Sequence, residues 1–175
     1  MSDHASTGVK RLRAKGANVI SNRIESSVPD SAIDEMLEEG IFGAVDYGTG
    51  KSLDSDEAGS RTGSAALNNM VDVSRNGAYI VSFTPSFDRV FLSRVTPSSI
   101  RFEEFQDTEG ETTTVLKCVE AEVYTEIEED KFQGIYDVIS DRQRLVFHNI
   151  KDSDHRERVV AALTAQERSG KIQRN

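Results

Sequence analysis

The chain has little of several residue types on which common classes of site depend. Among its 175 residues there is one cysteine, Cys118, and there is no tryptophan. A single cysteine cannot form an internal disulfide or a multi-thiolate zinc site, and it fits a reducing compartment such as the cytoplasm. The three histidines, His4, His148 and His155, do not have the spacing of a metal-binding pair. We therefore expect no metal and no cofactor.

Long apolar runs are also missing. No stretch approaches the roughly 18 consecutive apolar residues of a membrane-spanning helix. The first residues, MSDHASTGVKRLRAKG, have no apolar core of the kind found in a secretory signal. The sequence therefore predicts a cytoplasmic protein without a transmembrane segment, consisting of one folded domain with polar flanks.

Charge is distributed unevenly along the chain. Residues 1–25 and 131–175 each carry a net charge of +3, whereas residues 26–75 carry −7 and residues 76–130 carry −8. An acidic body repels a phosphate backbone, which argues against nucleic-acid binding by the whole protein. The N-terminal basic patch, which has no aromatic residues for base stacking, offers only weak attraction to nucleic acid or an anionic membrane. It consists of Lys10, Arg11, Arg13 and Lys15.

The stretch GAVDYGTGKSLDSDEAG, residues 43–59, contains pieces of two ligand-binding loops. A phosphate-binding P-loop needs a glycine five positions before the glycine of GKS, and Val45 stands there. A calcium loop beginning at Asp54 needs a glutamate at its twelfth position, and Ala65 stands there. Both readings fail, so we expect a Gly/Ser/Asp-rich connector at residues 46–64.

Capping and periodicity predict two short helices before residue 77. PDSAIDEMLEEG has Asp30 or Ser31 as a cap and Gly40 at its end, and SAALNNMVDVSR is a second short helix. The expected organisation is a disordered basic arm at 1–30, short helices and linker at 31–76, a β-rich domain at 77–169 and a tail at 170–175.

Residues 77–169 have the pattern of strands followed by one helix. AYIVSFT, RVFLSR, SIRFEEF, FQGIYDVIS and RQRLVFHNI are expected strands, the last two forming a hairpin, and KDSDHRERVVAALTAQERSG is an expected helix. TTVLKCVEAEVYTEI alternates, with Val115, Val119, Ala121, Val123 and Ile127 on one face. The fold class is therefore α+β: an antiparallel curved sheet or barrel of six to seven strands, closed by a C-terminal helix.

No catalytic constellation is evident in this region. A Cys118–His148 dyad is conceivable, but Cys118 lies in the middle of an expected strand rather than at a helix start that lowers the thiol pKa. The glutamates alternate or adjoin as on a solvated sheet face, and we do not expect an enzyme. They are Glu103, Glu104, Glu120, Glu122 and Glu126.

The segment GIYDVISDRQRLVFHNIKDSDHRERVVAALTAQ resembles the end of the pleckstrin-homology superfold. The resemblance covers residues 78–168 and implies a curved sheet capped by the helix, acting as a binding module for phosphoinositides, peptides or proteins. The family's helical tryptophan is absent, and Arg89 and Arg94 are the only basic residues near the first two strands. The resemblance therefore implies a protein ligand rather than a lipid.

These patterns predict a non-enzymatic adaptor or interaction protein. The apolar residues Ile33, Met36, Leu37, Ile41 and Phe42 either insert into a partner groove or pack on the chain's own domain, and both outcomes remain open. The alternative is a self-assembling structural or accessory protein, for example a viral matrix or virion-associated one, in which basic termini meet the acidic middle of a neighbour.

Overall fold

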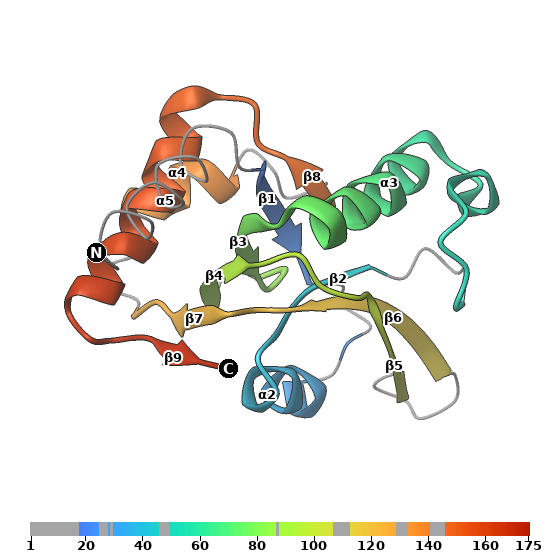
Figure 1. Ribbon diagram of the computed structural model, residues 1–175, viewed down its shortest axis with the longest axis horizontal. Helices are drawn as coiled ribbons and strands as arrows, with labels where there is room; N and C mark the ends of the chain where they lie inside the picture. The colour runs from blue at the N-terminus through green and yellow to red at the C-terminus, as the bar shows by residue number, and fades with distance from the viewer. Residues whose placement is uncertain are drawn as a thin grey trace, which may run out of the picture.

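The computed structural model describes residues 18–24, 28, 30–45, 50–86, 88–106, 113–128, 133–140 and 146–175, and these form an α+β structure with two sheets (Figure 1). The large sheet has the order β8-β1-β3-β4-β7-β9 and the small sheet the order β2-β6-β5. The strands are β1 (Asn18–Arg23), β2 (Ile41–Val45), β3 (Ala78–Phe83), β4 (Val90–Val95), β5 (Arg101–Gln106), β6 (Thr113–Glu120), β7 (Val123–Glu126), β8 (Phe147–Asn149) and β9 (Gln173–Arg174).

The large sheet is mixed and open, which corrects the expected antiparallel barrel. β1 pairs with β3 in parallel, while its pairing with β8 and the remaining pairings of both sheets are antiparallel. The strand order is linear, with β8 and β9 at opposite edges of the large sheet. The α+β class and the C-terminal helix are confirmed.

The helices are α2 (Asp30–Glu38), α3 (Arg61–Asn76), α4 (Gln133–Ser140) and α5 (Ser153–Arg168), with a 3-10 turn η1 at Ser55–Ala58. α5 starts where the Asp152 carboxylate accepts a hydrogen bond from the His155 N–H, and α3 starts where the Ser60 hydroxyl accepts from the Gly63 N–H. α2 is followed by Gly40 at φ 67°, a conformation that favours glycine. None of the described helices combines the length and apolar character needed to cross a bilayer.

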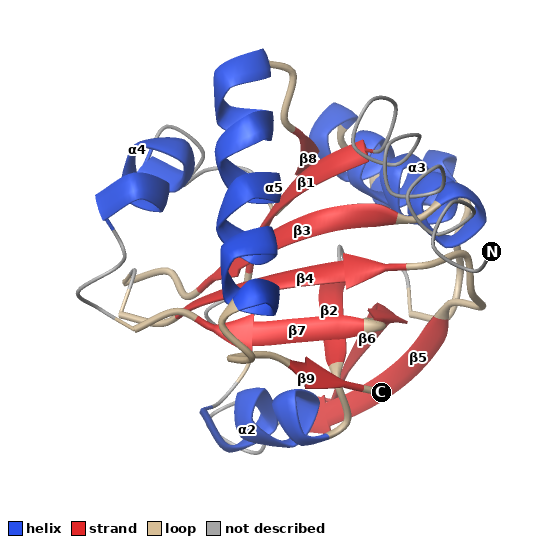
Figure 2. Ribbon diagram, turned by 60° about the vertical axis from the view of Figure 1, so that its left-hand side comes forward, coloured by secondary structure: helices blue, strands red, loops and turns tan. Residues whose placement is uncertain are grey.

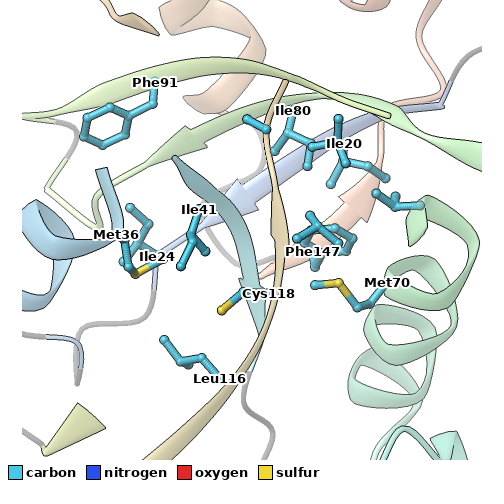
Figure 3. Packing of buried hydrophobic residues seen from close by; sticks show 14 of the residues in the cluster. Ile20, Ile24, Met36, Ile41, Met70, Ile80, Phe91, Leu116, Cys118 and Phe147 are labelled. Carbon is cyan, nitrogen blue, oxygen red and sulfur yellow. The ribbon is translucent and has the colours of Figure 1, made fainter. Parts of the chain in front are cut away.

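Two apolar cores lie on opposite faces of the large sheet. Successive residues of β3 alternate between them: Ile80 belongs to the first core, which α2, α3, β2 and β6 complete, and Val81 to the second, which α4 and α5 cover. Figure 2 shows α5 crossing the face of β3, β4 and β7, and Figure 3 shows first-core side chains between the sheets. Because both faces are covered, every residue of β3 and β4 is buried.

Strand β1 contradicts the expectation of an unstructured segment for residues 18–23. It lies inside the large sheet, between β3 and β8, and Ile20 is fully buried. Its central position is possible because the side chains of both faces reach a core, Val19 the second and Ile20 the first. Residues 1–17 lie outside the described residues, and the arm prediction for them stays a prediction.

The segment expected to be the first strand of a hairpin is helix α4. Its buried residues Ile135, Val138 and Ile139 are spaced i, i+3 and i+4, which is the period of a helix rather than a strand. The strand prediction is therefore wrong for residues 133–140, while β8 confirms a strand in RQRLVFHNI. The hairpin on which the pleckstrin-homology resemblance depended is absent from the described residues.

The long alternating segment is two strands in different sheets. β6 belongs to the small sheet and β7 to the large one, and the break falls at Ala121–Glu122. There the Ala121 N–H donates to the Gly40 carbonyl and the Glu122 N–H to the Arg94 carbonyl, both at 2.8 Å. The residues expected on one face are therefore divided: Val119 and Ala121 pack in the first core, and Val123 and Ile127 pack in the second.

Elements on both sides of residue 77 build the same sheets. β1 pairs with β3, and β2 pairs with β6. The expected tail is also involved, because β9 pairs with β7 and the Asn175 side chain donates to the Ala121 carbonyl at 2.7 Å. The β-rich unit expected at 77–169 is thus completed by strands from outside those limits.

Candidate functional site: a groove beside strand β7

A groove lies where the edge of the large sheet loses its last strand. β9 pairs with β7 through Val123 and Tyr124 only, and at the next residue of β7 the Thr125 hydroxyl, rather than the backbone, bonds to the Lys171 carbonyl at 2.8 Å. Two adjoining hollows of about 420 and 280 Å³ share Thr125, Glu126 and Lys171, and together they form the groove. The remaining lining residues are Leu37, Tyr124, Glu128, Gln166, Gly170, Ile172 and Gln173.

The lining of the groove combines apolar and charged side chains. Leu37 of α2 and Ile172 line the larger hollow and Glu128 lines the smaller one, while Glu126 and Lys171 line both. Glu126 is held by Arg89 at 2.7 Å, and Arg89 also reaches Asp34 of α2 at 2.9 Å. Burial lowers the pKa of Arg89, but the hydrogen bonds that it donates to the two carboxylates, together with their charges, outweigh burial and raise that pKa overall. Arg89 thus fixes α2 beside β7.

Beyond the groove, α2 and the small sheet present an acidic face. A single arginine, Arg101, contacts Glu39, Glu103 and Glu120 at distances of 2.5–3.1 Å. In these contacts three cations, Lys51, Arg89 and Arg101, meet six carboxylates, so the region is net negative. The six are Asp34, Glu39, Glu103, Glu104, Glu120 and Glu126.

The predicted protein-binding residues separate into two groups. Ile33, Met36 and Ile41 are buried in the first core. These three side chains therefore pack on the chain's own domain. Leu37 is part-buried and lines the groove. The side chain of Phe42 lies outside the described residues, as do Lys10, Arg11, Arg13 and Lys15. A cavity beneath α2, lined by Ile33 and Met36, holds about 10 Å³, the space of one water molecule rather than a ligand.

The cysteine and the described histidines are not arranged as a nucleophile and its base. Cys118 is fully buried, and burial raises its thiol pKa to about 12. His148 lies on β8, a strand of the other sheet. His155 lies near Asp152 and Asp154, but Asp152 caps α5 and Asp154 pairs with Arg158 at 3.0 Å. These carboxylates already stabilise the helix start.

The groove residues that the sequence did not indicate come from two distant segments. Tyr124 and Thr125 belong to β7, and Lys171 and Ile172 follow α5. The available signal was Thr125, which with Lys117 is one of two polar residues between Val115 and Ile127 on the apolar face of the alternating segment. Its partner is a backbone carbonyl 46 residues away, and no local pattern identifies such a partner.

No family model matches the chain, and comparisons with curated proteins and with solved structures find no match. The functional argument therefore depends on the geometry of the chain itself.

Proposed function

We propose that this chain is a non-enzymatic interaction protein that binds an extended, basic segment of a partner protein in the groove. The observation that carries the proposal is the divergence of β9 from β7 at Thr125, which opens a hollow beside a sheet edge. Sheet edges bind extended peptides through the backbone, and adjoining pockets select side chains.

The lining of the groove indicates the chemistry of the partner. Leu37 and Ile172 offer an apolar surface for one side chain of the segment. Glu126 and Glu128 favour lysine or arginine, and the neighbouring acidic face attracts a basic partner from a distance. The same field repels nucleic acid and anionic membranes, so a protein is the proposed partner and the cytoplasm its proposed location.

A non-enzymatic role is supported by the state of the reactive side chains. A thiol with a pKa of about 12 is protonated at neutral pH and is a poor nucleophile. The carboxylates of the groove and of the acidic face are largely solvent-exposed, and several are held by arginines. Such an arrangement favours electrostatic recognition over general acid–base chemistry.

The experiment is a selection of random displayed peptides on the immobilised full chain. We expect enriched peptides that combine Lys or Arg with an apolar residue and that shift the backbone NMR signals of Thr125, Glu126 and Lys171. The exposed Glu128→Lys change should weaken their binding about fivefold. Glu57→Lys, at an exposed site on η1, is the matched control. Peptides without a charge preference, or equal weakening by both variants, would contradict the groove.

A second candidate function is self-assembly as a structural or accessory protein. The segregation of charge favours it, since the basic ends of the sequence complement the acidic face in sign. Light scattering at low and high salt distinguishes the two functions: assembly held by charge dissociates as salt is added, whereas a groove-binding monomer does not change.

A further inference from the structure

The outer edge of strand β5 is a second place where the chain can accept a strand. β5 lies at the end of the small sheet and pairs with β6 along all six of its residues (Figure 2). In an antiparallel pair, alternate residues direct their N–H and C=O groups away from the partner. Across the described residues, no backbone hydrogen bond joins those outward groups to another segment. An edge of six residues is long enough for strand addition.

The charges on β5 exclude one obvious occupant, the same edge of a second copy. Two antiparallel copies of β5 that pair through this same edge bring residues of like parity opposite each other, so a pairing centred on Glu103 or on Glu104 places that glutamate opposite the same residue of the other copy. Like charges directly opposite each other destabilise a strand pair. Glu39 and Glu120, which both contact Arg101 of β5, add to the repulsion. The edge therefore selects a basic strand.

The chain itself contains a segment of that chemistry. VKRLRAK, residues 9–15, has four cations in seven residues. In an extended conformation Arg11, Arg13 and Lys15 lie on one side and alternate with Leu12 and Ala14. Seven extended residues span about 23 Å, and the six residues of β5 span about 20 Å. The lengths as well as the charges match.

We propose that residues 9–15 of one copy add as a strand to the outer edge of β5 in a second copy, with Arg11 and Arg13 on the face of Glu104 and Lys10 on the face of Glu103. The inference rests on the second function proposed above, self-assembly, and it does not involve the groove. The contact joins two different surfaces, the arm of one copy and the β5 edge of another. If two copies exchange arms, the result is a closed dimer; otherwise each copy binds the next and an open chain of copies forms.

The first test is sedimentation of the full chain over a range of concentrations, at about 20 mM and about 500 mM salt. We expect association at low salt that is lost at high salt. Arg11→Glu with Arg13→Glu should weaken association at least about tenfold. The matched control, Arg61→Glu with Arg75→Glu, makes the same charge change at exposed positions of α3 and should have less than about a twofold effect.

The second test is a charge exchange across the contact. Glu104 is exposed, and Glu104→Lys alone should weaken association because it places lysine opposite arginine. Combined with Arg11→Glu and Arg13→Glu, the same change should restore association. In the wild-type chain, hydrogen exchange at the outward amides of β5 should slow as the protein concentration rises. Thermal unfolding of each variant verifies that it is folded.

Several results would overturn the inference. They are a monomer at every concentration, equal weakening by the arm variant and its control, and no recovery in the charge exchange. Protection of β5 that is independent of concentration but lost in the arm variant would place the arm on its own chain, which also contradicts a second copy. Failure of arm addition to β5 does not change the expected effect of Glu128→Lys on peptide binding in the groove. The two proposals can therefore be rejected independently.

Discussion

Two arginines of this chain make the same kind of contact in different surroundings. Arg94, on β4, reaches Glu167 of α5 at 2.6 Å and Glu122 at 3.4 Å, and its side chain is 10% exposed. Arg101, on β5, contacts Glu39, Glu103 and Glu120, and its side chain is 36% exposed. For both, burial lowers the pKa of the guanidinium while the carboxylates raise it, and the net change is upward.

The difference in burial separates a structural role from a surface one. Arg94 joins α5 to the large sheet in a place shielded from water, where an unpaired charge is costly. Arg101 joins α2, β5 and β6 in water, where salt screens the attraction and each pair contributes little. The same chemistry therefore stabilises the fold at Arg94 and shapes the electrostatic potential of the acidic face at Arg101.

The largest effect is expected from Arg94→Ala. It leaves Glu167, 16% exposed, with the 3.7 Å contact from Arg174, and should lower the free energy of unfolding by about 3–5 kcal/mol. Urea unfolding measures the loss, and Arg94→Lys, which keeps the charge, should lose less. A loss as small as that of Arg101→Ala would remove the distinction between the two arginines.

The next effect concerns Cys118, whose register partner on β5 is Arg101. Burial is the main cause that raises its pKa from an ordinary 9.0 to about 12. An unfolded thiol releases its proton near pH 9 and the folded one near pH 12, so this contribution to stability is complete below pH 9 and falls above it. From pH 8 to pH 10 the wild-type chain should lose about 1 kcal/mol more than Cys118→Ala.

Urea unfolding at the two pH values measures that difference, because the lysines and tyrosines common to both proteins cancel. Equal losses of unfolding free energy in the wild-type chain and in Cys118→Ala would mean that the Cys118 thiol is as accessible to water as its register partner Arg101. The region around Arg101 would then be open throughout rather than only at its surface.

A smaller effect is expected from Arg101→Ala. Removing one cation that the exposed Glu39 and Glu120 share with the half-buried Glu103 should reduce the free energy of unfolding by about 1 kcal/mol or less at low salt. The loss should largely disappear at about 500 mM salt because the charges are screened. A salt-independent loss would assign Arg101 a packing role like that of Arg94.

The smallest effect is expected at Asp88, a carboxylate that accepts hydrogen bonds from hydroxyl groups but has no arginine contact among the described residues. Hydrogen bonds from Ser86 and then Thr84 lower the pKa of the exposed Asp88 below its ordinary 3.8. The carboxylate is favoured in the folded state, so its contribution is present above pH 3.8 and is lost as the pH falls through the lowered value. Asp88→Asn should make acid unfolding slightly less steep, and identical acid profiles would contradict this.

Local signals were sufficient for most elements. The cap at Asp152 and the turns between β3, β4 and β5 involve residues close in sequence, and the predicted helix and strands there are confirmed. β1 was missed because VISNRI has polar residues within it, and the strands that bury it come much later in the chain. The segment of α4 gives two conflicting signals. Its β-branched residues favour a strand, whereas the i, i+3, i+4 spacing of Ile135, Val138 and Ile139 favours a helix, and the helix forms.

The sheet assignment and the groove needed three-dimensional information. Nothing in the alternation of residues 113–127 marks the passage from one sheet to the other, since Val119 and Val123 are equally apolar and equally buried. The groove combines α2, β7 and the segment after α5, three regions that meet only in the folded chain.

The place of β1 between β3 and β8 has a consequence for how the chain acquires its structure. During synthesis β1 emerges first, its parallel neighbour follows only after α3, and its antiparallel neighbour near the end. Pairings between such distant segments must close long loops, which slows folding. A nascent chain therefore holds β1 without its parallel partner until β3 emerges, and with one edge unpaired until translation is nearly complete, and over that interval it is susceptible to aggregation.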